Sequence, residues 1–243
     1  IINKAMARRR RTRRTRAVTE NEVIQPVVTK GMVGGKYKPL TDHEIEQIHK
    51  TTLDVLENIG MSNPLPQLKE VALEQGCNFT DQGRLCFPRS LVEDVIARAG
   101  RDFVMYGRDP KHDIEMTDKK VHLYGGGEAV TILDLGATTY RPSTINDVYD
   151  IARVVDYLEN IHSYSRLVVA TEFTDLLKTD INTAYASVVG TTKHTALTFG
   201  NGKHVKPTIE MLEVIAGGEG KFLKRPFCHG GGCTVVSPLR YGT

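Results

Sequence analysis

Four strand candidates recur along the second half of the chain at nearly constant spacing. They begin near residues 121, 161, 194 and 227, so successive starts are 40, 33 and 33 residues apart. A helical pattern separates each candidate from the next. Strands that alternate with helices at this period predict right-handed βα units that share a parallel sheet. The spacing therefore places the chain in the α/β class.

The number of units bounds the architecture. A complete (β/α)8 TIM barrel takes about 250 residues, whereas residues 121–243 number 123. We therefore predict that residues 117–243 form about the first four βα units of such a barrel. A small open sheet is the alternative. A half-barrel would expose an edge strand and one face of its core, which soluble proteins avoid. The count thus favours a fragment of a longer protein, and we expect the isolated chain to aggregate and to be inactive.

The sequence pattern over residues 41–116 predicts a smaller α+β region in which neighbouring elements are joined by short, local connections. Thr41–Glu44 and Ser90–Glu93 each have the pattern of a capping box, and the first opens a helix with an apolar stripe that stops at Gly60. Asp81-Gln82-Gly83 is typical of a hairpin turn. We expect the first barrel strand over Val121–Gly125.

The basic character of the chain belongs to its first residues. Residues 1–16 contain one lysine, seven arginines and no acidic residue. Removing these eight from the 32 basic residues leaves 24 against 29 acidic residues, a net charge of −5 for the remainder. An arginine-rich segment can bind nucleic acid through phosphates. No aromatic residue is interleaved to stack on bases, so residues 1–40 are better read as a disordered basic tail and an extended lead.

The cysteines and the apolar runs exclude several classes of protein. Cys77, Cys86, Cys228 and Cys233 form no CxxC pair, which argues against a zinc ribbon. Cys228, His229 and Cys233 could converge on a metal, but small buried fillers are the favoured interpretation, and we expect reduced thiols and no bound metal. Apolar runs stay short of the roughly 18 residues of a membrane span, and no signal peptide is evident. We expect a cytoplasmic protein.

A set of stretches in fixed order resembles a known family. The stretches include GGKYKPLTDHEIEQIH, DVLENIGM, FPRSLVEDVIARAGRDFVMYGRDP, SRLVVA, TTKHTALTF, and RPF followed by VVSPL. Together with the arginine-rich start and the glycine triplet after HLY, they cover nearly everything from about residue 6 to 243. In this order the chain resembles the corrinoid-dependent trimethylamine methyltransferases and their non-pyrrolysine relatives, which include glycine betaine methyltransferases.

The resemblance implies an N-terminal α/β region followed by a β/α barrel in a protein about twice as long. It also implies transfer of a methyl group from trimethylamine or a glycine betaine-type amine to the cobalt of a corrinoid carried by a partner protein. We expect neither S-adenosylmethionine nor a membrane to take part, and we expect a homo-oligomer when the protein is complete. The pyrrolysine of the trimethylamine enzymes would lie beyond Thr243, so the sequence leaves the choice of amine open.

In a β/α barrel the active site lies at the carboxyl ends of the strands. Backbone there could face the corrinoid at Gly125, Gly126, Gly127, Gly230 and Gly231, or these glycines could serve tight turns.

Four side chains at these ends are candidates for substrate binding. Glu128 could offset an ammonium charge or be an exposed carboxylate. Arg166 could bind a substrate carboxylate or brace a loop through an ion pair. Asn201 could hydrogen-bond the substrate or serve a turn, and His229 could orient a ligand or be structural. We assign no catalytic acid or base, because a departing amine leaves neutral and positioning dominates methyl transfer.

Three competing functions are weighed against this one. The glycine triplet before Glu128 could be a nucleotide or S-adenosylmethionine loop, but a hairpin around Gly136 follows it instead of a helix, so we reject that reading. A β/α-barrel lyase or hydrolase of other chemistry, and a nucleic-acid-binding protein that uses its arginine tail, remain alternatives.

Overall fold

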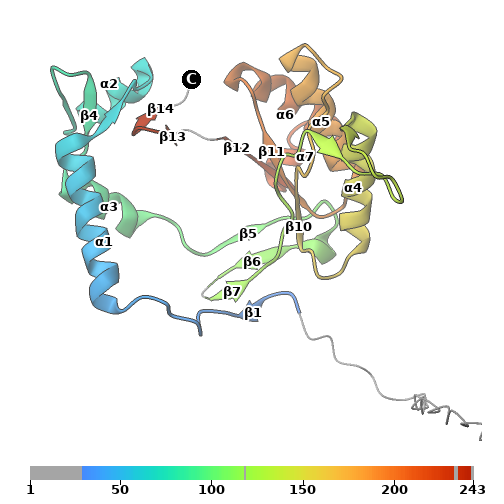
Figure 1. Cartoon of the computed structure of the whole chain (residues 1–243), viewed down its shortest axis with the longest axis horizontal. Helices are drawn as coiled ribbons and strands as arrows, with labels where there is room; N and C mark the ends of the chain where they lie inside the picture. Colours follow the sequence, from blue (N-terminus) through green and yellow to red (C-terminus); the bar gives the residue numbers. More distant parts are fainter. Residues whose placement is uncertain (1–28, 118, 233–234, 242–243) are drawn as a thin grey trace, which may run out of the picture.

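The structure is a computed structural model that describes residues 29–117, 119–232 and 235–241. Its helices and strands form two groups, an N-terminal one around α1–α3 and a second one around α4–α7, joined by extended segments (Figure 1). The predicted basic tail and Cys233 lie outside the described residues. Within the described residues, none of the helices has the length and apolar character needed to cross a bilayer.

The first helix begins and ends where the sequence predicts. Thr41 caps α1 (Asp42–Asp54): the Glu44 amide donates to Thr41 Oγ1 at 3.3 Å and the Thr41 amide donates to the Glu44 carboxylate at 2.7 Å. The helix continues as a π-helical turn, η1 (Val55–Ile59), and stops at Gly60 with φ of 68°. A Cβ on Gly60 would lie 2.4 Å from the carbonyl oxygen of Leu85, so a larger residue does not fit there.

The apolar stripe of α1 is only partly covered. Leu53 is buried, whereas Ile45 and Ile48 are 53% and 55% exposed. Periodicity predicted a buried face, and within the described residues no segment packs over this part of it.

The capping box predicted at Ser90 is wrong. Helix α3 (Arg89–Arg98) begins one residue earlier, after Pro88, and makes no side-chain cap of its own. Glu57 replaces the local cap: its carboxylate accepts from the Arg89 amide at 3.4 Å and from Arg89 Nε at 2.9 Å. A tertiary contact from η1 thus supplies what the sequence pattern assigned to Ser90.

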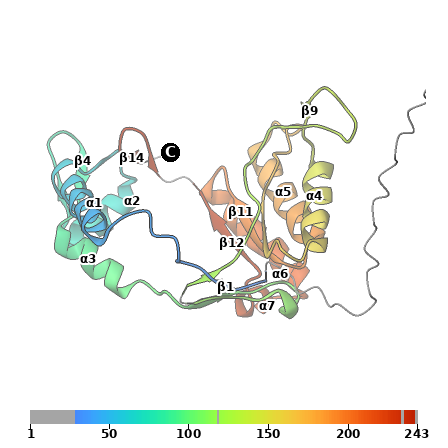
Figure 2. The same cartoon turned by 60° about the horizontal axis from the view of Figure 1, so that its bottom comes forward.

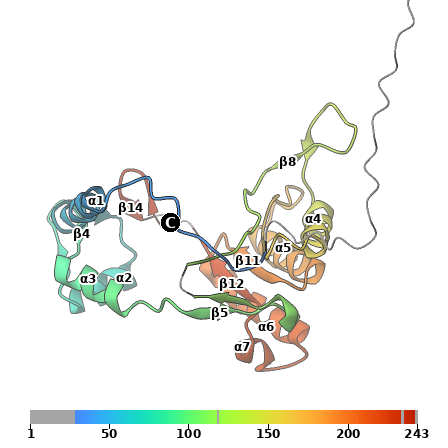
Figure 3. The same cartoon turned by 90° about the horizontal axis from the view of Figure 1, so that it is seen from below.

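A five-stranded sheet combines three strands of the N-terminal group with a hairpin from the C-terminal part of the chain. The predicted hairpin is present as β3 (Asn78–Phe79) and β4 (Arg84–Cys86). The order is β13 (Val235–Val236), β14 (Arg240–Tyr241), β2 (Met61–Ser62), β4 and β3, with β14 parallel to β2. Helix α2 (Pro66–Glu74) connects β2 to β3. Figures 2 and 3 show β14 beside α1, although their colours place these two elements near opposite ends of the chain.

Two short antiparallel ribbons connect the groups. One pairs β5 (Phe103–Met105) with β6 (Ile114–Met116) around the 3-10 turn η2 (Pro110–His112). The other pairs β1 (Met32–Val33) with β7 (Lys120–Val121). The strand predicted over Val121–Gly125 is therefore wrong in its extent, because β1 binds its start. The later part of the predicted strand does pair: Leu123 O accepts from the His162 amide at 2.7 Å, and Tyr124 forms a parallel bridge to Ser163.

The second group contains a parallel sheet with helices on one face. Its strands are β10 (Ser163–Ser165), β11 (His194–Thr198) and β12 (Cys228–Gly231), in that order and all parallel. The helices are α4 (Ile145–Tyr157), α5 (Leu176–Gly190), α6 (Val205–Ala216) after the turn η3 (Gly202–His204), and α7 (Lys221–Lys224). The expected hairpin before α4 is β8 (Thr131–Ile132) with β9 (Arg141–Pro142). Parallel βα units are confirmed. The described strands do not close, so the TIM barrel stays a prediction.

The core lies between this sheet and its helices. Leu197 and Cys228 point toward the helices and pack with Ala184, Val188 and Leu212. Gly190 lets α5 approach α4, because a Cβ there would lie 2.6 Å from Ala152 Cβ. The sheet is thereby fixed from one side, and its other face is left to form a site.

Candidate functional site

The face of the sheet turned away from the helices carries small and polar side chains. Cα pairing in parallel strands places partners on the same face, and the pairs are Ser163 with His194, Ser165 and His229 with Ala196, and Gly231 with Thr198. Small residues on this face leave room in front of the sheet. Its carboxyl end is marked by Thr198 and Gly231.

Three segments are joined at that carboxyl end by one carboxylate. Glu128 lies 3.0 Å from Arg166 Nη2, and its Oε1 accepts from Thr198 Oγ1 at 2.8 Å. Glu128 has φ of 52°, a left-handed conformation that costs a non-glycine residue roughly 1–2 kcal/mol. Its amide donates to the Arg166 carbonyl at 3.4 Å. Backbone strain compensated by specific contacts is common at functional sites.

The ion pair bears on one of the two predicted roles of Arg166, whereas its binding of a substrate carboxylate stays a prediction. The side chain is 11% exposed, against 41% for Glu128, so the guanidinium is largely removed from water and its charge needs a partner. Bracing of a loop through an ion pair, one of the two predicted roles, is confirmed. Both contacts of Glu128 use Oε1, and its predicted role in offsetting an ammonium charge stays a prediction.

Asn201 serves the loop after β11. Its side chain accepts from the Lys203 amide at 2.9 Å and caps η3, so the turn role predicted as an alternative is present.

An aspartate–histidine pair that the sequence did not single out holds the same loop. Buried Asp180, from α5, accepts from the Gly200 amide at 2.9 Å and lies 2.7 Å from His204 Nδ1. These two residues are 24 positions apart, and no local motif indicates their contact. The loop at the end of β11 is therefore fixed from both sides.

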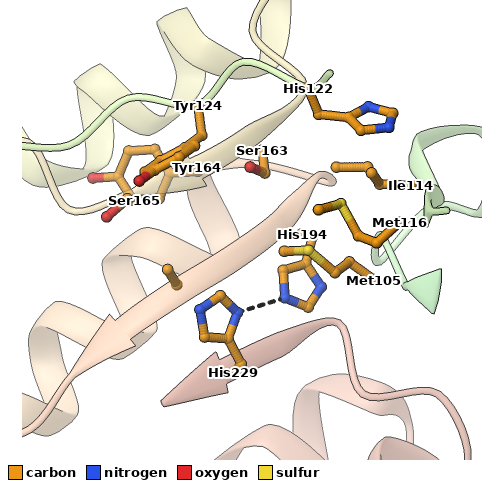
Figure 4. A pocket seen from close by; sticks show the side chains of 11 residues that line it. Met105, Ile114, Met116, His122, Tyr124, Ser163, Tyr164, Ser165, His194 and His229 are labelled. Carbon is orange, nitrogen blue, oxygen red and sulfur yellow. Dashed lines mark hydrogen bonds between the residues drawn. The ribbon is translucent and has the colours of Figure 1, made fainter. Parts of the chain in front are cut away.

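His229 is joined to a second histidine. Its Nδ1 lies 2.9 Å from Nε2 of His194, and His194 Nδ1 lies 2.7 Å from the carbonyl oxygen of Tyr106 (Figure 4). Burial lowers the pKa of His194 to about 4 and also lowers that of His229. Both rings are therefore neutral near pH 7. The sequence pointed to His229 but not to His194, which begins a strand and carries no pattern of its own.

A cavity of about 420 Å³ lies between this face and the β5–β6 ribbon. Its lining combines Met105, Ile114 and Met116 from the ribbon with Ser163, Ser165, His194 and His229 from the sheet, and with His122 and Tyr124 (Figure 4). None of the described residues that line it is an Asp, Glu, Lys or Arg. Both ring nitrogens of His122 are buried without a hydrogen-bond partner among the described residues. The cavity is thus neutral, partly apolar and short of hydrogen bonds.

The candidate glycines divide into two kinds. At Gly127 and Gly231 an added Cβ would meet nothing within 4 Å, and at Gly126 only ordinary contacts at 3.7 Å or more. At Gly125 it would crowd Leu167 at 3.1 Å, and at Gly230 it would meet the Phe199 ring at 2.8 Å. The first three leave backbone open to an incoming molecule, whereas Gly125 and Gly230 make room for neighbouring side chains.

The site offers no preformed metal centre among the described residues, where no group of three His, Cys, Asp or Glu side chains converges. Cys77, Cys86 and Cys228 are buried free thiols, and burial raises the pKa of Cys228 to about 12.

Comparison with known proteins gives a consistent result. The family model described as trimethylamine methyltransferase (MTTB) matches residues 6–243. The chain is 31% identical over 201 residues to trimethylamine methyltransferase MttB of Desulfitobacterium hafniense (strain DSM 10664 / DCB-2), which covers 82% of the chain and 40% of the relative. It is 27% identical over 183 residues to MttB of Methanosarcina thermophila, covering 74% and 38%.

A more distant relative carries another name. Glycine betaine methyltransferase of Desulfitobacterium hafniense (strain Y51) is 21% identical over 197 residues, which cover 81% of the chain and 40% of that protein. The chain thus spans about two fifths of the length of the curated relatives it matches.

Proposed function

The chain belongs to the trimethylamine methyltransferase family, and on that premise we propose that the complete protein is a methyltransferase that moves a methyl group from a methylated amine to the cobalt of a corrinoid carried by a partner protein. The observation that carries the proposal is the family match, which runs through both groups of elements from residue 6 to residue 243. The proposed architecture is a β/α barrel whose first strands are those described here.

The carboxyl ends of the strands suit such a reaction. The carbon–nitrogen bond breaks with both electrons going to nitrogen, so a protonated or quaternary amine departs neutral and needs positioning more than proton transfer. The Glu128–Arg166–Thr198 cluster holds three segments in one geometry. Preorganised groups of this kind reduce the reorganisation that a reaction requires.

Open backbone supports the proposed partner. Gly126, Gly127 and Gly231 leave space where side chains would otherwise stand, which fits the close approach of a large flat macrocycle. The corrinoid would supply the electron pair that forms the new bond to the methyl carbon. The chain's own residues would orient the amine and exclude water around it.

A reconstituted assay tests the proposal. The complete gene product is mixed with a reduced corrinoid protein and either trimethylamine or glycine betaine, and cobalt methylation is followed by absorbance together with the demethylated amine. We expect methyl transfer from one of these amines only when the corrinoid protein is present. Absence of cobalt methylation with every methylated amine tried overturns the proposal.

Two substitutions connect the assay to the site. Gly231→Val adds a side chain where a Cβ meets no described atom within 4 Å, so it should slow transfer to the partner-bound corrinoid while the protein stays folded. Gly100→Val, also in open space but at the end of α3, is the matched control. Equal activity of the two variants would remove Gly231 from the proposed contact surface.

A further inference from the structure

We infer that His229 presents an unprotonated Nε2 to the cavity as a hydrogen-bond acceptor, and that it recognises the N–H of a protonated tertiary amine in preference to a quaternary ammonium ion. This inference rests on the proposed function and specifies its substrate. It makes His229 a specificity-determining residue and His194 a positioning residue.

The tautomers follow from a single fixed acceptor. A carbonyl oxygen only accepts hydrogen bonds, so the 2.7 Å contact with the Tyr106 carbonyl requires a proton on His194 Nδ1. In a neutral ring the other nitrogen, His194 Nε2, then carries the lone pair. At 2.9 Å it accepts from His229 Nδ1, which must hold the proton. His229 Nε2 is left as an acceptor, fixed by a chain of two bonds.

The ring geometry agrees with this chain. The two ring centroids are 5.1 Å apart and the ring planes differ by 18°. Nearly coplanar rings at that separation with a 2.9 Å nitrogen–nitrogen distance are joined edge to edge by an in-plane hydrogen bond, and their faces do not overlap. Figure 4 shows the bond lying between the rings at one side of His229. Its Nε2 is directed away from His194, and the His229 side chain is exposed.

The cavity restricts what can occupy this acceptor. Among the described lining residues there is no ionic side chain to pair with a carboxylate or a phosphate. Met105, Ile114, Met116 and the ring of Tyr124 instead offer surface to methyl groups. Aromatic faces also attract alkylammonium cations. A small methylated cation fits this lining better than an anion does.

The acceptor then separates two kinds of methylated cation. Like lysine, an alkylamine is protonated at neutral pH, so a tertiary amine brings one N–H to His229 Nε2. A quaternary ammonium ion has no such proton and leaves Nε2 unsatisfied. Both cations carry a single positive charge, so any attraction to Glu128 at the strand ends acts on both alike and does not offset the loss.

The tautomer can be read directly in the complete gene product labelled with ¹⁵N-histidine. Two-bond ¹H–¹⁵N spectra distinguish a protonated ring nitrogen from an unprotonated one. We expect His229 to show a protonated Nδ1 and an unprotonated Nε2 at pH near 7. Trimethylammonium chloride should shift the Nε2 resonance, and tetramethylammonium chloride should not. A protonated Nε2, or equal responses to the two salts, overturns the inference.

Binding measurements give an independent test. Loss of one charge-assisted hydrogen bond corresponds to roughly a ten- to hundredfold loss of affinity. His229→Asn should weaken trimethylammonium binding by about that factor and change tetramethylammonium binding by less than about twofold. His194→Asn removes the acceptor for His229 Nδ1, so it should reduce the preference for trimethylammonium and leave a mixed His229 tautomer. Unchanged preference in both variants would refute the assignment.

The outcome is separable from that of the methyl-transfer assay. If methyl transfer to the corrinoid protein occurs while His229 discriminates nothing, the proposed function stands and this inference falls. If His229 binds trimethylammonium selectively but no cobalt is methylated, the acceptor stands and the proposed reaction falls.

Discussion

Acidification should destabilise the protein through His194. The ring is 4% exposed and its pKa in the fold is about 4, against 6.5 for an ordinary histidine. Burial is the main cause, and the Tyr106 carbonyl opposes it in part. Because the folded-state pKa lies below the unfolded one, only the unfolded chain takes up this proton between these two values. Stability is complete above pH 6.5 and is lost as the pH falls toward 4.

The size of the effect follows from linkage. A pKa of 6.5 unfolded and about 4 folded predicts a loss of about 2 kcal/mol between pH 7 and pH 5. Replacement of His194 by Asn keeps a donor for the Tyr106 carbonyl and removes the titration. The variant should be less stable at pH 7 by about 1–2 kcal/mol, yet lose about 2 kcal/mol less than the wild type on acidification.

Urea unfolding, followed by circular dichroism, gives the free energy of unfolding of both proteins at pH 7 and at pH 5. The quantity of interest is how much more of this free energy the wild type loses on acidification than the variant does. His43→Asn, which removes a histidine from the exposed surface of α1, is the matched control. The reasoning is refuted if the wild type and His194→Asn lose the same free energy between pH 7 and pH 5.

Three further substitutions test the packing and the caps. Lys193→Met removes an ammonium group that donates to three carbonyl oxygens at 2.6 Å each near the end of α4. Urea unfolding should therefore show that the free energy of unfolding falls by about 2–4 kcal/mol. A loss below about 0.5 kcal/mol, the usual size for a surface substitution, contradicts this prediction. Gly190→Ala should cost about 1–3 kcal/mol through its contact with α4, whereas Gly202→Ala, with open space around it, should be nearly neutral. The hydrogen bond from Arg141 holds the pKa of Asp147 far below its usual range, and burial of the carboxyl group opposes this shift in part. Asp147→Asn should therefore destabilise the protein at neutral pH, and its difference from the wild type should shrink as the pH falls below about 4, where the unfolded carboxyl becomes protonated.

Features set by neighbouring residues could be predicted from the sequence. The capping box at Thr41 and the turn at Gly83 depend on contacts within four residues, and the parallel βα rhythm follows from periodicity. The capping box predicted at Ser90 was wrong because Glu57, 32 positions from Arg89, supplies the cap instead. The predicted start of the first barrel strand was wrong because a distant segment also decides it: β1, about 90 residues earlier in the chain, pairs with β7.

Much of the candidate site escaped prediction on the same grounds. Glu128 and Arg166 could be selected because they follow strand candidates, whereas the placement of His229 at a strand end is wrong: it is the second residue of β12 and pairs with Ala196 in the middle of β11. Their partners could not: His194 meets the Tyr106 carbonyl across 88 positions, and Thr198 meets Glu128 across 70. Such contacts depend on how the strands align in three dimensions, and no local pattern records that alignment.

The return of the C-terminal hairpin to β2 has a consequence for biosynthesis. Arg84 donates to the Leu239 carbonyl across 155 positions, and the Ser62 amide donates to the same oxygen. At the usual rates of about 5–20 residues per second, a ribosome needs roughly 8–30 s to move from one of these residues to the other. During that interval β2 has an unpaired edge, which is a template for pairing with another nascent chain. Ribosome-bound chaperones that cover β2 until residue 241 has emerged would protect the yield of folded protein.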